Sequence, residues 1–189
     1  MEPTNEYAGS VDDSPMLVSL TKRVEAARVL DLPSRLLQPL AGALTANPAR
    51  RDVLLGMPVG HAVHPALTDL PVGFWISATV LDLVGGRASR PAATRLLALG
   101  LLAAVPAAVT GLAEWGETGT REKRVGVVHA ASNTVAIALF ASSLKARRHD
   151  QHMRGVLLAA AGSAATGVSG YFGGHLTTVR KVSSRHPDF

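Results

Sequence analysis

The sequence predicts an all-α membrane protein: a four-helix transmembrane bundle preceded by amphipathic surface helices. Composition is the first observation, because hydrophobic residues make up 47% and aromatic residues only 4%, so the apolar mass is mostly Ala, Leu and Val. Charged residues make up 17%, and the mean hydropathy is +0.21. The third observation is a series of four apolar segments. This profile is typical of small multi-span membrane proteins.

The residues before position 60 have a different pattern. Apolar residues recur at roughly helical spacing from Met16 to Ala27, with Lys22 and Arg23 among the charged residues between them. This predicts an amphipathic helix on the bilayer surface or on the bundle. A second short apolar helix is expected after Pro33, with a bend at Pro39. The acidic, polar first residues do not resemble a signal peptide.

The four apolar segments run from about residues 65–84, 93–113, 126–144 and 155–174. Each is close to the ~20 residues that cross a ~30 Å hydrocarbon core as a helix. Small residues in the fourth segment, such as Ser163, Gly167 and Gly170, favour close helix contact. A soluble bundle of two buried hairpins is the alternative, but few charges interrupt the segments. The predicted organisation is residues 1–59 as polar start and surface helices, 60–177 as the four-span domain, and 178–189 as a basic tail.

The charge pattern bears on partners and orientation. The formal net charge is +5, and the basic residues crowd the ends of the apolar segments, which indicates topology signals and phospholipid contacts rather than nucleic-acid binding. The absence of cysteine excludes thiolate metal sites and cysteine-ligated iron–sulfur clusters from this chain. The two membrane faces carry nearly equal numbers of Lys and Arg. We therefore expect both termini in the cytosol from the N-terminal segment alone, in a multi-pass protein of the cell membrane that could form a homo-oligomer.

Polar residues gather at one predicted face of the bundle. Antiparallel helices alternate in direction, so the starts of the first and third segments share a face with the ends of the second and fourth. At those ends stand His61, His64, Asp69, Thr110, Glu114, His129, Asn133, Tyr171 and His175. The opposite face is expected to have only Arg/Lys loops. Ionisable residues within membrane spans are costly and are functional candidates by default. Asp69 is expected to bond an imidazole or a bound cation.

Four stretches in this region resemble a known family. "GHAVHPALTDLPVGFWISATVLDLVGG", "TGLAEW", "HAASN" and "GYFGGHL", in that order, are similar to the motifs of the DUF2231 family of bacterial membrane proteins. The resemblance covers roughly Leu54 to Thr177. Ala62 departs from it, since the family often has proline between the two histidines. Some relatives are fused to Rieske-type iron–sulfur domains, so the resemblance implies a four-span fold and an iron–sulfur electron-transfer partner. The family has no settled activity.

Three classes of function follow from the polar cluster. The first is electron transfer by haem b, bound by two of His64, His129 and His175, with Asn133 and Tyr171 nearby and with Gly167 and Gly170 making room for the ring. The second is a non-haem Zn, Fe or Cu site, with ligands from His61, His64, Asp69, Glu114, His129 and His175. The third is an accessory subunit without cofactor. No nucleophile elbow or phosphate loop is present, so the sequence leaves open whether the protein is an enzyme. Haem b is the favoured reading.

Overall fold

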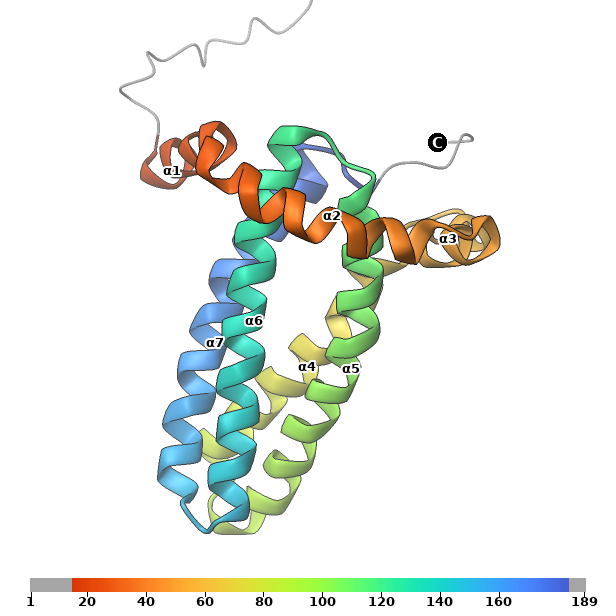
Figure 1. Ribbon diagram of the computed structural model, residues 1–189. Helices are drawn as coiled ribbons and strands as arrows, with labels where there is room; N and C mark the ends of the chain where they lie inside the picture. The colour runs from red at the N-terminus through yellow and green to blue at the C-terminus, as the bar shows by residue number, and fades with distance from the viewer. Residues whose placement is uncertain (1–14, 184–189) are drawn as a thin grey trace, which may run out of the picture.

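The computed structural model describes residues 15–183, which are helices joined by short turns, with no strand among them. The four long helices are α4 (Val63–Val84), α5 (Arg90–Gly116), α6 (Thr120–Arg148) and α7 (His152–Gly174). Each belongs to a helical segment long and apolar enough to cross a membrane. They form an elongated antiparallel bundle (Figure 1). The predicted all-α four-helix bundle is therefore confirmed. The polar first 14 residues and the last six residues of the basic tail lie outside the described residues.

Helices α5 and α6 extend beyond their predicted apolar segments. Helix α6 begins at Thr120, within the polar stretch "TREKR", and α5 continues to Gly116. Polar turns at a helix end are solvated outside the hydrocarbon core, so hydropathy alone underestimates the length of the helix. Pro71 and Pro106 lie inside α4 and α5, as expected for membrane helices. After α7 the chain continues as a π-helical turn, η5 (His175–Val179).

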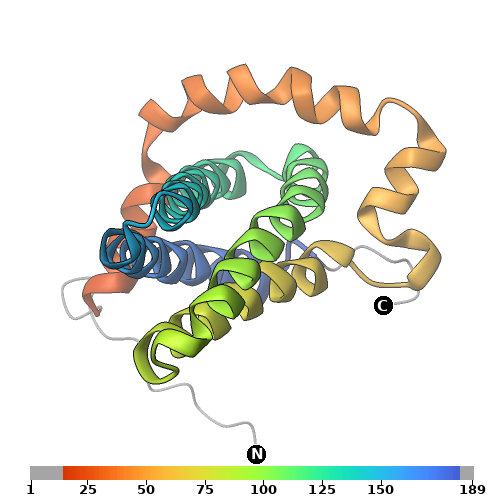
Figure 2. The ribbon, with the colours of Figure 1, turned by 90° about the horizontal axis from the view of Figure 1, so that it is seen from below.

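The N-terminal helices lie across one end of the bundle and curve around it (Figures 1 and 2). We call residues 16–59 the collar. Its elements are α1 (Met16–Ala26), η2 (Arg28–Leu30), α2 (Asp31–Thr45), α3 (Pro48–Leu55) and η3 (Met57–Val59). Pro39 lies within α2 without ending it. The start of α3 is capped by Asn47, whose side chain accepts from the Arg50 N–H, and α3 ends at Gly56 in the left-handed conformation.

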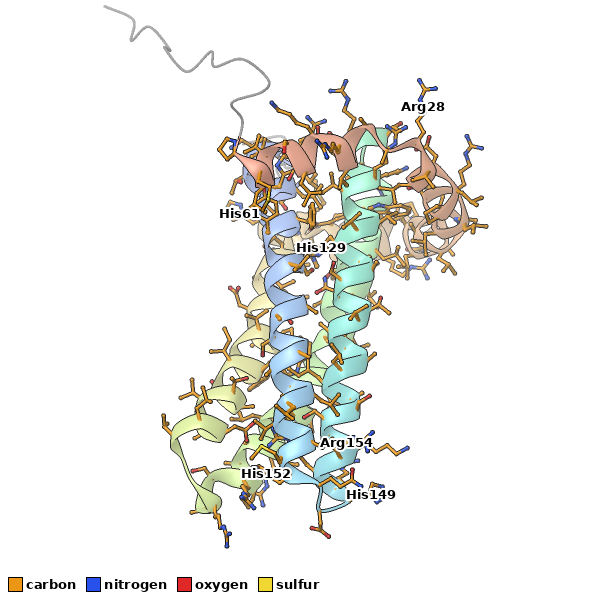
Figure 3. All side chains as sticks on the ribbon, turned by 90° about the vertical axis from the view of Figure 1, so that its left-hand side faces the viewer. Arg28, His61, His129, His149, His152 and Arg154 are labelled. Atoms are coloured by element: carbon orange, nitrogen blue, oxygen red, sulfur yellow. The ribbon has the colours of Figure 1, made fainter. Side chains whose placement is uncertain are left out.

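Helix α2 has the polarity of a helix at a membrane interface. Ser34 and Ala41 are buried against the rest of the protein. Leu32, Leu36 and Leu40 form a stripe with one residue per turn, and each is more than half exposed. Arg28, in the preceding turn, points away from the bundle (Figure 3). The apolar stripe of α2 therefore suits the acyl chains beside the bundle.

The bundle consists of two hairpins built on one plan. In the first hairpin α4 buries Pro71, Trp75 and Ala78, and in the second α6 buries Ala136, Phe140 and Ser143 at the same spacing. The second helices match in the same way. Helix α5 buries Ala93, Leu97, Gly100 and Ala107, and α7 buries Gly155, Ala159, Gly162 and Ser169. The two hairpins are therefore equivalent halves of a bundle with approximate two-fold symmetry.

Equivalent residues meet where the two hairpins join. The rings of Trp75 and Phe140 stack with centroids 4.1 Å apart and planes at 19°. Gly100 and Gly162 leave room for these rings, since a Cβ at Gly100 would lie 2.3 Å from the Trp75 Nε1 and one at Gly162 would lie 3.1 Å from the Phe140 ring. The stack therefore marks the pseudo-two-fold axis in the middle of the bundle.

The bundle end away from the collar contains a buried ion pair. The expectation that this end has only arginine and lysine is wrong, because Asp82 lies there and accepts two hydrogen bonds from Arg147, one of them 2.8 Å long. Each side chain is only 2% exposed. The Arg147 Nε also donates to the Ser143 hydroxyl at 3.2 Å. Asp82 and Arg147 occupy equivalent positions in the two hairpins, so the pair joins them on the axis.

Candidate functional site

His64 and His129 face each other at the collar end of the bundle. Their ring centroids are 6.4 Å apart, and the ring planes are nearly perpendicular at 88°. His64 comes from the first turn of α4, and His129 comes from α6. The two residues are equivalent in the hairpin repeat, because each precedes the aromatic residue of the central stack by the same number of residues. The histidine pair therefore also lies where the two hairpins meet.

Hydrogen bonds fix the tautomer and direction of both rings. The His64 Nδ1 lies 2.9 Å from the carbonyl oxygen of Ala107, and the His129 Nδ1 lies 2.9 Å from that of Ser169. A carbonyl oxygen only accepts, so Nδ1 carries the proton in both rings and Nε2 keeps its lone pair. Ala107 and Ser169 are equivalent positions in α5 and α7. Each hairpin thus orients its own histidine through a backbone carbonyl. Metal-binding histidines are oriented by similar hydrogen bonds from the ring nitrogen that does not bind the metal.

Two glycines leave the space that these rings occupy. A Cβ at Gly111 would lie 2.6 Å from the His64 Cε1, and one at Gly173 would lie 2.9 Å from the His129 Cε1. Each glycine follows its carbonyl partner by one turn, in α5 and in α7 respectively. In contrast, Gly167 and Gly170 have no atom within 4 Å of such a Cβ. Gly167 and Gly170 therefore do not hold the imidazole rings, and their expected role in making room for haem stays a prediction.

The two histidines differ at Nε2. The Asn133 side-chain amide donates to the His129 Nε2 at 3.1 Å. The equivalent residue in α4 is Thr68, whose hydroxyl donates to the Pro65 carbonyl instead. Thr110 belongs to the site as well, with its Oγ1 3.5 Å from the His64 Nδ1. The Asn133 amide is thus the polar group that currently occupies one of the two lone pairs.

His175 and Tyr171 bind the collar rather than the histidine pair. The His175 Nε2 lies 2.8 Å from the Glu25 Oε1 in α1. The Tyr171 hydroxyl donates to the Leu17 carbonyl and lies 3.1 Å from the Thr21 Oγ1, also in α1. Both residues were expected beside the other histidines, but their partners are in α1. Their side chains are used to attach α1 to the end of α7.

The remaining candidates are also separated from the pair. Asp69 is exposed on α4, because five residues after His64 the helix has turned by about 140°. His61 and Glu114 line a cavity of about 10 Å³ beside Gly56, room for about one water. Among residues 15–183, no group of three or more His, Asp or Glu side chains could hold a metal ion. The predicted six-residue metal site is therefore not assembled.

Ion pairs attach the collar above the site. Arg124, in α6, donates to both carboxylate oxygens of Asp31 at 2.7 and 3.0 Å, and to the Glu25 carbonyl at 2.8 Å. The hydrogen bonds from Arg124 hold the pKa of the Asp31 carboxyl below its usual value of 3.8. Arg51 pairs with Glu117 at 2.9 Å, and this bond raises the pKa of the Arg51 guanidinium. These contacts tie α2 and α3 to the ends of α5 and α6.

These features define the class of protein first. Four spanning helices with a polar pair at one end belong to an integral membrane protein rather than to a soluble bundle. The model of the family described as "Predicted membrane protein (DUF2231)" matches residues 60–186, and the chain belongs to that family. No curated protein and no solved structure matches the chain.

Proposed function

We propose that the protein binds a single redox centre, haem b, between His64 and His129, and transfers electrons in the membrane. One observation carries the proposal: two equivalent imidazoles face each other, each with Nδ1 bonded to a carbonyl, so that each Nε2 offers a lone pair. The His129 Nε2 accepts a hydrogen bond from the Asn133 amide, which a bound centre would have to displace. A metal ion between the rings would be held by both nitrogens.

The number of ligands favours haem over a bare metal ion. Structural zinc takes four protein ligands, and catalytic zinc takes three. Haem brings four nitrogens of its own and requires only two axial ligands, which histidines of a helical bundle can supply. The described residues offer two imidazoles and no third histidine or carboxylate beside them. This set of ligands fits an axial pair.

His64 and His129 are the residues that would hold the centre, and their ring centroids are 6.4 Å apart. Ligation by His129 requires that the Asn133 amide leave Nε2, so Asn133 competes with the centre for that atom.

When bound, haem supplies a one-electron couple. The residues of the chain orient the two imidazoles, and the Nδ1–H bonds to Ala107 and Ser169 make the ligands more basic. The electron partner that we propose is a Rieske-type iron–sulfur protein at the collar end. A cysteine-ligated cluster has to belong to another chain or domain, because this sequence has no cysteine.

The collar supports the proposed orientation, with both termini and the histidine pair on the cytosolic side of the cell membrane. The collar carries six basic residues at the histidine face, and this excess follows the positive-inside pattern. They are Lys22, Arg23, Arg28, Arg35, Arg50 and Arg51. Single cysteines at Ser89 and Thr118 test the orientation by labelling of intact cells. Labelling of Thr118 from outside would contradict it.

An optical spectrum tests the haem proposal. The full chain is expressed with a haem precursor, purified and reduced, and His64→Ala, His129→Ala and His175→Ala are prepared in parallel. We expect a Soret band with low-spin α and β bands, lost in the first two variants and kept in the third. A metal content without a Soret band would replace haem with a bare ion. A bound species unchanged in all three variants, or no bound species at all, would leave the accessory-subunit reading.

A further inference from the structure

A groove at the bundle end away from the collar has two cations, Lys145 and Arg154, in its lining. It has a volume of about 530 Å³, within the range of small-molecule sites. Lys145 and His149 of the α6 end and Arg154 of α7 line it, together with Gln151 and the apolar Leu158. Figure 3 shows His149 and Arg154 at this end, away from His61 and His129 at the other. The groove is independent of the histidine pair.

The cations of the groove are not neutralised by the protein. Arg147, the neighbouring arginine, is paired with Asp82 inside the bundle and leaves the groove to the others. Arg154 donates to the Gln151 side chain, which is neutral. Asp150 is the one carboxylate of the turn between α6 and α7, and it does not line the groove. The groove therefore presents an excess of positive charge at the edge of the membrane span.

The equivalent surface of the first hairpin is a comparison within the molecule. There the positions of Lys145 and His149 are occupied by Val80 and Val84, which are 49% and 79% exposed. The position of Arg154 is occupied by alanine. The equivalent positions of the first hairpin therefore carry no cations, although Arg87, Arg90 and Arg95 lie elsewhere at the same end. Cations at the groove positions are not required by the plan that the two hairpins share.

We propose that this groove binds the phosphate headgroup of an anionic phospholipid. Lys145 and Arg154 stand near the ends of two candidate spanning segments, and basic pockets between membrane helices bind such headgroups. The first turn of α7 has no acidic residue and no side-chain cap, so its positive end adds to the attraction. Leu158 continues the groove as apolar surface toward the acyl chains.

Native mass spectrometry of the full chain in detergent tests the assignment. Dioctanoyl phosphatidylglycerol and dioctanoyl phosphatidylcholine are titrated in turn. We expect one phosphatidylglycerol to bind preferentially, and the double variant Lys145→Gln with Arg154→Gln to weaken it by about fivefold for each cation removed. The matched control, Arg87→Gln with Arg95→Gln, removes the same charge from exposed positions at the same end and should change little.

Three results would overturn the proposal. Equal binding of the two lipids would remove the charge preference, and an equal loss in the control variant would reduce the effect to net charge. Displacement of phosphatidylglycerol by an equal concentration of inorganic phosphate would assign the groove to a soluble anion instead. Circular dichroism checks that both double variants keep the helical content of the parent protein.

Discussion

Each end of the bundle has a pair of equivalent residues, one from each hairpin, but the two pairs differ in chemistry. At one end equivalent residues form the ion pair of Asp82 and Arg147, in which each partner satisfies the other. At the other end equivalent residues are His64 and His129, and both present acceptors. A complementary pair completes itself and serves assembly of the hairpins. Two acceptors cannot bond to each other, so each needs a third group, such as the Asn133 amide at His129 or a metal ion between the rings.

Breaking the ion pair gives the largest expected effect. Asp82→Ala or Arg147→Ala leaves a buried charge without its partner, which costs about 3–5 kcal/mol. Unfolding in detergent, followed by circular dichroism, measures the loss. Exchanging the residues, Asp82→Arg with Arg147→Asp, should recover much of the stability because the two positions are equivalent. Failure of the exchange to improve on the single variants would argue against the two-fold plan.

Gly111 and Gly173, which leave room for the two imidazole rings, test the site at the other end. Gly111→Ala and Gly173→Ala each place a methyl group against an imidazole ring, so the ring has to shift. We expect affinity for the centre to fall by about tenfold or more, as for other losses of second-shell support. Gly170→Ala in α7 is the control, since its Cβ would meet no atom. Haem titration of the apo-protein measures the affinity of all three variants. A similar loss of affinity in the control would contradict the role of Gly111 and Gly173.

Substitution of Asn133 is expected to have a smaller effect, and to raise rather than lower the affinity for the centre. Because its amide occupies the His129 Nε2, Asn133→Ala should release this lone pair and raise the affinity for the centre by about fivefold, the value of one hydrogen bond. The same titration measures the change. If Asn133 instead supported the bound centre, the variant would bind more weakly, and the competition described above would be wrong.

The collar is expected to respond to acid with the smallest effect. The pKa of Asp31 is lowered in the folded chain by hydrogen bonds from Arg124. Its contribution is therefore present above its unfolded pKa of about 3.8 and is lost as the pH falls through the lower folded value. Protease cleavage within α2 should become faster in that range. Asp31→Asn should reproduce the faster cleavage at neutral pH, and an unchanged rate would contradict the attachment.

The number of spanning helices and the bundle end that carries the histidines could be predicted from the sequence. Which of the polar residues contact one another could not. Hydropathy and the alternating direction of spans place His64 and His129 at one end, and both are there. His175 was misplaced because its partner, Glu25, lies in a helix whose docking hydropathy does not describe. Asp69 lies on another side of α4 because the helix turns by about 140° between His64 and Asp69. The signal missed was the repeated spacing, which matches His64, Trp75 and Asp82 with His129, Phe140 and Arg147.

The angle between the two imidazole planes offers the most direct test of the central claim. In a low-spin ferric haem, perpendicular axial imidazoles give a highly anisotropic electron paramagnetic resonance spectrum dominated by one large g value. Parallel imidazoles give a rhombic spectrum instead. The observed angle of 88° predicts the first result for the haem-loaded protein. A rhombic spectrum, a high-spin spectrum or a protein that takes up no haem would contradict a centre held between His64 and His129.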